Sequence, residues 1–376
     1  MENTTQTMDN YTIFVDENIT NSTVDAETTS HETIIACTLI FILVGTVGIG
    51  GNMLVMLSVM CNRKMRSSMT NLLIMNLAFA DLLIMVFGIP EIVVFMRNTG
   101  WSLGLFTCKI NRYVLVAALY GSILTLVSLS VERYIAIIHP IKAHIFCNKR
   151  RLVAVLGSIW PVATAAALPT ALFNTINNSG PSNQILFCML RFPVHHDTVF
   201  LVLKYTESIV FYFTPLCLQI ILYACISKHL FIGTDRLYHR VQVRDLNGLS
   251  VERLSEALRA RRGVVKMLVL SVFVYFLSYS PHQVLLVWNT VSPKTFHENW
   301  SYLVFTMIIA YINSAVNPIL YSIFSQNFRN CYKQFVLCLL GDRKPVRKLR
   351  NQPPSQLTHG SPRLWRIMST TASTNV

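Results

Sequence analysis

An acidic, a basic and an aromatic residue stand side by side at the end of a long apolar run, in the segment SVERYIAIIHP from Ser130 to Pro140. Glu132, Arg133 and Tyr134 form this group. Charged side chains beside a hydrocarbon layer are costly unless they pair or perform a function. Glu132 and Arg133 can form an ion pair, and the simplest interpretation is that they neutralise each other at an interface.

A second candidate for chemistry is Asp81, which lies deep inside the apolar run NLAFADLLIMVF. An ionisable group at that depth needs polar partners, and Asn52, Ser122, Asn313 and Asn317 fall at comparable depth in other runs. Together their oxygens would suit a small hard cation such as sodium. The alternative is a protonated or hydrated Asp81 that is hydrogen-bonded to Asn317 without an ion. We expect no other metal and no cofactor.

The chain that positions these groups is strongly apolar. Of its 376 residues, 52% are hydrophobic and 13% are charged, which is about half the charged share of a soluble protein. Seven apolar runs are long enough to cross a bilayer as helices. They lie near 34–60, 69–96, 106–138, 152–173, 199–226, 263–290 and 301–324. The sequence therefore predicts an all-α membrane protein, a bundle of seven transmembrane helices over residues 34–324.

The distribution of Lys and Arg predicts the orientation in the membrane. Residues 1–33 contain none, whereas 24 of the 32 follow the first, third, fifth and seventh runs. Because positive loops stay in the cytoplasm, the N-terminus should be extracellular. Glycosylation sequons in the first segment agree, and we expect a multi-pass plasma-membrane protein. These sequons begin at Asn3, Asn10, Asn18 and Asn21.

Two further segments follow the last span. Phe324 and Phe328 are four residues apart, which suits a short amphipathic helix on the bilayer surface over 325–340. Residues 341–376 are hydroxyl-rich at their end and have nothing to bury, so a disordered cytoplasmic tail is expected. We expect the net charge of +14 to reflect mainly this topology and partly an attraction to anionic membrane lipid of the inner leaflet.

Cysteine positions indicate different roles. Cys108 opens the third span and Cys188 precedes the fifth, both on the oxidising side, and we expect them to form a disulfide. Cys331 and Cys338 follow the last span, where S-palmitoylation or an unmodified thiol packed on the bilayer are both compatible with the sequence. Cys338 is the candidate we select.

Several classes of function are disfavoured. The sequence has no metal-ligand cluster, phosphate-binding glycine loop or nucleophile elbow, so we do not expect an enzyme. The basic residues are scattered over four loops, which argues against nucleic acid as a partner. A transporter or channel remains an alternative because seven spans with a buried Asp81 would suit one, although internal repeats are absent.

Taken together, these features resemble the rhodopsin family of G-protein-coupled receptors along all seven runs. No single motif decides the resemblance, but their order and spacing are specific. The motifs are Asn52 in GNMLV, NLAFAD, Trp101 with Cys108, ERY, Trp160, Pro215 with Tyr223, Pro281, and NPILY with Asn317, Pro318 and Tyr321, followed by Phe328.

The resemblance implies a role for the opening motif. Glu132 would hold Arg133 in the silent receptor, and an outward swing of the sixth helix would free it to contact a heterotrimeric G protein. Tyr223 and Tyr321 would meet the arginine in the active state, and Ile141 would insert into the G protein. The tail would serve a kinase and arrestin.

The sequence departs from the family around Pro281. Tyr275, Ser278 and Tyr279 stand where the family usually has Phe, Cys and Trp. Tyr279 is smaller than tryptophan and brings a hydroxyl, so its part in switching is open. Ile123 retains its place in the usual core triad.

Other departures bear on basal activity and on the ligand. Arg261 stands where some relatives have an acid that grips the motif arginine, so we expect basal signalling. Leu115 replaces the aspartate of aminergic receptors, which argues against an amine ligand. Tyr311 replaces the retinal lysine of opsins.

The subgroup follows from ERYIAIIHPIKAHIFC, which resembles thyrotropin-releasing-hormone-type and invertebrate neuropeptide receptors. The hormone-binding residues of the former are replaced here by Val116, Tyr120, His282 and Met307, so another extracellular peptide is expected. A small non-amine or lipid ligand is the alternative. Candidate ligand contacts are Glu91, Arg112, Tyr120, Glu207, His282, Gln283 and Tyr311.

Overall fold

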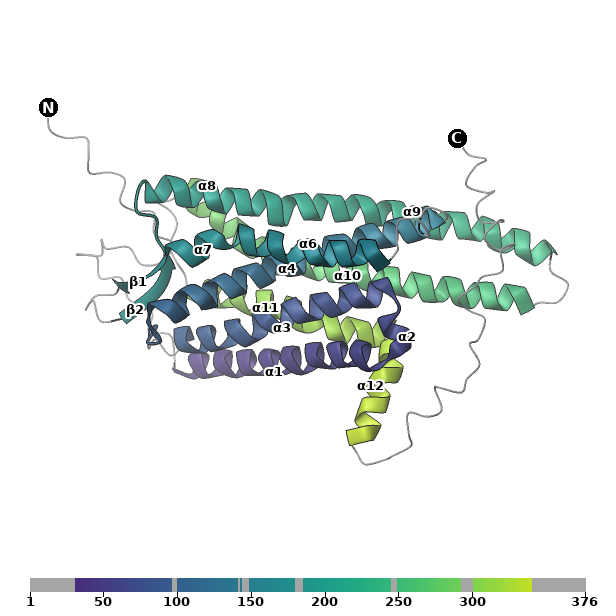
Figure 1. Cartoon of the computed structure of the whole chain (residues 1–376), viewed down its shortest axis with the longest axis horizontal. Helices are drawn as coiled ribbons and strands as arrows, with labels where there is room; N and C mark the ends of the chain where they lie inside the picture. Colours follow the sequence, from purple (N-terminus) through teal and green to yellow (C-terminus); the bar gives the residue numbers. More distant parts are fainter. Residues whose placement is uncertain are drawn as a thin grey trace.

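The computed structural model describes residues 31–96, 100–140, 143, 149–179, 185–244, 249–291 and 300–339. Long helices run side by side and form an elongated bundle (Figure 1). The helices are α1 (His31–Cys61), α2 (Arg63–Arg66), α3 (Met69–Met96), α4 (Gly104–Ile138), α6 (Lys149–Ala166), α7 (Leu168–Phe173), α8 (His196–Ser208), η1 (Ile209–Phe213), α9 (Thr214–Arg244), α10 (Leu249–Val291), α11 (Trp300–Phe324) and α12 (Gln326–Leu339).

Seven helical segments in the described part are long and apolar enough to cross a membrane. The fourth span joins α6 and α7, and the fifth joins α8, η1 and the first half of α9. Their bounds are Glu32–Cys61, Met69–Val94, Gly104–Ile138, Arg150–Phe173, His196–Leu230, Arg262–Trp288 and Tyr302–Phe324. The predicted seven-helix bundle is therefore confirmed.

Side chains on the bundle surface are apolar, as a lipid environment requires. Leu43 is 63% exposed and Val153 is 68% exposed, whereas the polar Asp81 and Asn52 are fully buried. This inverts the usual arrangement of a soluble protein, in which buried polar groups are rare. Interior polar groups therefore mark the places where function is concentrated.

Two glycines allow the first two spans to approach the seventh. A Cβ on Gly51 would lie 2.9 Å from Pro318, and a Cβ on Gly88 would collide with the Tyr311 hydroxyl. Because side chains at these positions would push the helices apart, the glycines place α11 against both α1 and α3.

The end of the bundle that carries the connection between the fourth and fifth spans is closed off by a hairpin. Strand β1 (Asn174–Ser179) pairs antiparallel with β2 (Ile185–Leu190), with Ile176 opposite Cys188. A disulfide joins Cys188 to Cys108 at the start of α4. Figure 1 shows the hairpin at the opposite end of the bundle from α12.

At that other end, α9 and α10 extend beyond the bundle, and α12 turns off from the end of α11 and projects away from the bundle (Figure 1). The Phe328 ring is 1% exposed and stacks on Tyr321, with ring centroids 5.4 Å apart. The Cys331 Sγ lies 3.3 Å from the Met65 Sδ. Burial raises the pKa of the Cys331 thiol. These contacts fix α12 against the end of α11 and against α2.

Candidate functional site

The ERY motif forms a cage around its arginine at the inner end of α4. Arg133 Nε lies 2.6 Å from one Glu132 oxygen, and Arg133 Nη2 donates to the other at 2.6 Å. The Nη2 atom also donates to the hydroxyl of Thr70 on α3. Thr70 in turn donates to Glu132 Oε1 at 3.3 Å. The guanidinium is thus shared between its neighbour and the second span.

Tyr223 and Tyr321 are the two tyrosines expected to contact Arg133 in the active state. Ser130 Oγ donates to the Tyr223 hydroxyl at 3.0 Å. The Tyr321 hydroxyl is buried and has no hydrogen-bond partner among the described residues. Neither tyrosine has a hydrogen bond to Arg133 in the described part of the chain. Tyr134 packs edge-on against His139, with centroids 5.8 Å apart.

The inner end of α10 lies against its neighbours. Arg262 Nη2 donates to the Leu230 carbonyl of α9 at 3.4 Å. A Cβ added to Gly263 would be 3.2 Å from the Phe324 carbonyl oxygen at the end of α11. The sixth span is therefore packed inward, and this closed arrangement coexists with the caged Arg133.

The predicted polar set is brought together in the middle of the bundle. Asn317 Nδ2 donates to Asp81 Oδ2 at 2.7 Å, and Ser122 Oγ lies 3.2 Å from Asp81 Oδ1. Asn52 instead donates to carbonyls of the first and seventh spans at 3.0 and 3.1 Å. Asn313 is buried on the seventh span, four residues before Asn317. The carboxylate thus contacts two of its four expected partners directly.

The residues that depart from the family pattern pack in the core above this set. Ile123, Tyr275 and Tyr212 form one buried cluster, against which Tyr279 packs. The Tyr275 and Tyr279 rings are 5.0 Å apart. Pro281 lies inside α10 two residues beyond Tyr279. Tyr279 therefore packs at the edge of this cluster, beside Tyr275.

An open cavity lies at the hairpin end, with about 980 Å³ of empty space when the part that opens to solvent is included. Residues of α3, α4, α11 and β2 line it, together with Trp101. Most of the lining is apolar, and Glu91 and Arg112 supply the charges. This composition is typical of a ligand pocket with a few orienting polar groups.

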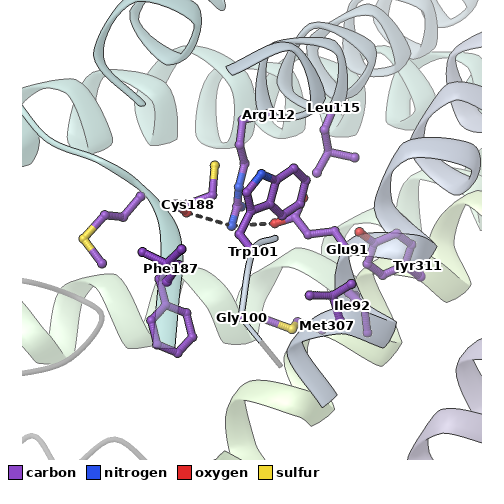
Figure 2. A pocket seen from close by; sticks show the side chains of 13 residues that line it. Glu91, Ile92, Gly100, Trp101, Arg112, Leu115, Phe187, Cys188, Met307 and Tyr311 are labelled. Carbon is purple, nitrogen blue, oxygen red and sulfur yellow. Dashed lines mark hydrogen bonds and ion pairs between the residues drawn. The ribbon is translucent and has the colours of Figure 1, made fainter. Parts of the chain in front are cut away.

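The two charges in the cavity form an ion pair across the second and third spans (Figure 2). Arg112 Nη2 lies 2.5 Å from Glu91 Oε1 and also donates to the Cys188 carbonyl at 3.4 Å. Asn111 Nδ2 donates to Glu91 Oε2 at 2.7 Å. Both carboxylate oxygens are thus occupied. The Arg112 side chain is 38% exposed, against 14% for Glu91, so the guanidinium is the charge within reach of a ligand.

The other predicted ligand contacts form a second group, between α4, α8 and α10. Lys204 Nζ lies 2.9 Å from Glu207 Oε2, and Tyr120 lies within electrostatic range of Glu207. His282 lies within electrostatic range of both charges and is more than a third exposed. Gln283 follows it on α10 and is partly buried. Of the seven candidates, Glu91, Arg112 and Tyr311 line the described cavity, and the rest do not.

Some contributors were missed by the sequence reasoning. Thr70 carries no motif of its own, and only its depth next to the ERY motif could have indicated it. The hairpin could have been inferred from the turn-forming run GPSNQ between two short segments. Asn3, Asn10, Asn18, Asn21 and Ile141 lie outside the described residues, and the Cys338 side chain is not described.

Comparison with known proteins gives a consistent result. Residues 51–321 match the model of the 7 transmembrane receptor (rhodopsin family). Neuropeptide receptor 15 of Caenorhabditis elegans is 34% identical over 308 residues, covering 79% of this chain and 89% of that protein. Human galanin receptor type 1 is 31% identical, covering 84% and 87%. The mouse thyrotropin-releasing hormone receptor is 28% identical, covering 83% and 81%.

The match spans more than half of the chain and includes every motif of the inner cage and the polar set. It confirms the resemblance drawn from those motifs, and it excludes the enzyme class. The chain is a multi-pass membrane protein that belongs to the rhodopsin family of seven-transmembrane, G-protein-coupled receptors.

Proposed function

We propose that this receptor binds an extracellular neuropeptide and activates heterotrimeric G proteins. The observation that carries the proposal is the open cavity with the Glu91–Arg112 pair at its wall. The names of the relatives support the peptide class, since the first three relatives compared are receptors for a neuropeptide, galanin and thyrotropin-releasing hormone. None of them favours the transporter or lipid-receptor alternatives.

The form of the cavity suits the end of a peptide. Its volume exceeds what a single side chain fills, and the hairpin lines one wall without filling it (Figure 2). Apolar side chains such as Phe187 and Met307 would bury an apolar residue of the ligand. A peptide could thus insert one end and leave the remainder at the outer surface.

Arg112 is the residue on which recognition should depend. Its Nε atom is buried and has no hydrogen-bond partner among the described residues. Because both oxygens of Glu91 are already used, the unmet hydrogen-bonding capacity is that of a donor. A ligand group that supplies an acceptor oxygen would complete the network after a small shift of the guanidinium.

Activation would follow from a population shift. An agonist that binds better to an arrangement with α10 swung outward would free Arg133 from Glu132 and Thr70, and Tyr223 and Tyr321 would then approach it. Shifting the population from 1:99 to 99:1 needs roughly 5.5 kcal/mol of differential affinity. A few buried polar contacts could supply that amount.

The remaining expectations belong to the same proposal. The charge asymmetry supports an extracellular, glycosylated N-terminus and a location in the plasma membrane. The hydroxyl-rich tail would be a substrate for kinases and a site for arrestin. Asp81, Ser122 and Asn317 would hold a sodium ion that favours the closed state.

A peptide library applied to cells that express the chain and a promiscuous G protein tests the proposal. Active peptides are then applied to Arg112→Gln and, as a control, to Lys109→Gln. Lys109 lies on the same helix but bonds the Leu172 carbonyl and does not line the cavity. We expect about a tenfold or greater loss of potency for Arg112→Gln and little change for the control. The absence of any active peptide, with responses to lipids or small molecules, would contradict the peptide class.

A further inference from the structure

The fifth span contains an irregular turn at the level of the core cluster. The five residues of η1 are π-helical, and Pro215 follows two residues later. Proline has no amide hydrogen, so Pro215 cannot donate to the carbonyl of Phe211, four residues before it. Within a membrane such a carbonyl must find another donor.

The sixth span supplies that donor. The Tyr275 hydroxyl donates to the Phe211 carbonyl oxygen at 2.7 Å. The Tyr275 side chain is only 3% exposed, so water does not compete freely for this bond. The tyrosine hydroxyl therefore joins the middle of α10 to the one carbonyl that the proline leaves without its usual partner.

A second hydroxyl bond lies farther toward the outer end. The Tyr212 hydroxyl and Ser280 Oγ are 2.7 Å apart. Ser280 donates its own hydrogen to the Phe276 carbonyl, also at 2.7 Å, so Tyr212 acts as the donor. The fifth and sixth spans are thus joined at two levels by side chains with hydroxyl groups.

Tyr275 is one of the residues at which this chain departs from the usual family pattern. The family usually has phenylalanine there, which would fill the same space between Ile123 and Tyr212 but could not bond the Phe211 carbonyl. The packing of the cluster needs only the ring, and the hydroxyl adds a directional contact between two helices.

We propose that Tyr275 is a positioning residue for signal transmission, whose hydroxyl clasps the sixth span to the Phe211 carbonyl and stabilises the closed arrangement. The bond is present in the structure in which Arg133 is caged and the inner end of α10 lies against α9 and α11. When α10 swings outward, its middle turns relative to η1, and a bond of 2.7 Å must lengthen or break. The clasp therefore opposes activation.

Tyr275→Phe tests the clasp, because it removes one oxygen and keeps the ring. Hydrogen bonds between membrane helices shift such equilibria by about threefold on average. We expect basal G-protein signalling, at matched surface density, to rise about threefold and agonist potency to rise with it. Tyr205→Phe removes a phenol hydroxyl from the fifth span, outside the cluster, and should leave basal signalling and agonist potency unchanged.

A measurement of the position of α10 distinguishes the loss of the Tyr275–Phe211 bond from a general loss of stability. It also distinguishes that loss from a change in coupling to the G protein. A fluorescent amino acid at the exposed position 266, on the inner part of α10, reports movement in purified receptor without any G protein. The Tyr275→Phe variant should show the open signal more often without ligand. Unchanged basal signalling and unchanged fluorescence would overturn the clasp, as would a lower melting temperature with neither change. If the wild-type receptor never signals, the proposed function is contradicted. The fluorescence measurement still tests the clasp in that case, because it does not depend on signalling.

Discussion

The guanidinium of Arg133 reaches from the third span to the hydroxyl of Thr70 on the second, and the same hydroxyl contacts Glu132. The resting cage is thus closed by a neutral side chain of α3. The sixth span has Arg261 at the position where some relatives have an acid, and two cations cannot attract each other. Thr70 provides a cross-helix contact that the sequence alone did not indicate.

Thr70→Val should increase basal signalling. Valine has nearly the same shape as threonine but cannot bond Arg133 or Glu132, so the arginine loses one of its two holders. We expect about a threefold increase in second-messenger output without ligand, measured over a range of receptor densities. Thr70→Ser keeps the hydroxyl and should behave like the wild type, and equal output from both variants would argue against the contact.

Arg133 itself should be indispensable for coupling. Arg133→Gln keeps a polar side chain of similar length but removes the charge that would contact the G protein, so guanine-nucleotide exchange in membranes should fall to background. Glu132→Gln should act in the opposite direction and raise basal exchange, because a neutral amide holds the guanidinium less strongly. Surface labelling must show normal delivery of both variants, and full coupling by the Arg133 variant would refute the mechanism.

The two groups of candidate ligand contacts predict different effects on the agonist. Glu207 is already paired with Lys204, so Glu207→Gln should alter the response mainly if the ligand reaches this deeper group. A ligand that reaches this group should lose about tenfold in potency against both Glu207→Gln and His282→Ala. Concentration–response curves decide this, and unchanged potency in both would confine the ligand to the Glu91–Arg112 cavity.

Sodium binding at Asp81 has a direct signature. The carboxylate is buried and bonded by Asn317 and Ser122, and a bound cation would favour this closed arrangement. Replacing sodium with a large organic cation at constant ionic strength should therefore increase agonist affinity in the wild type. Asp81→Asn removes the charge and should abolish the difference. An Asp81→Asn variant that keeps the full sodium effect would place the ion elsewhere.

The sequence was sufficient for the number and order of the spans because each apolar run must satisfy its backbone in lipid as a helix. The polar set was predictable for the same reason, since Asp81 needs buried partners, and Asn317 and Ser122 do contact it. The individual contacts between helices could not be predicted, because the periodicity of apolar residues does not say which helix faces which. Thr70 and the Tyr275–Phe211 bond depend on helix rotation and on a π turn that no pattern of apolar residues reveals.

The sequence also could not predict that the candidate ligand contacts fall into two separate groups. Glu91, Arg112, Glu207 and His282 all lie in the outer thirds of their helices, and depth alone groups them together. The separate placement arises because Arg112 turns toward the second span and Glu207 pairs within its own helix. Such pairings depend on side-chain geometry, which spacing along one chain does not fix.

Palmitoylation of α12 should fall on Cys338 and spare Cys331. The Cys331 thiol is 8% exposed, packs on Met65 and accepts a hydrogen bond from Asn62 at 3.6 Å. Burial also raises its pKa, so little of the reactive thiolate is present at neutral pH. Cys338 lies two turns further along, near the end of α12 that projects away from the bundle (Figure 1). In cells given a clickable palmitate analogue, Cys338→Ser should abolish labelling and Cys331→Ser should leave it unchanged, whereas the reverse result would mean that α12 leaves its position in the membrane.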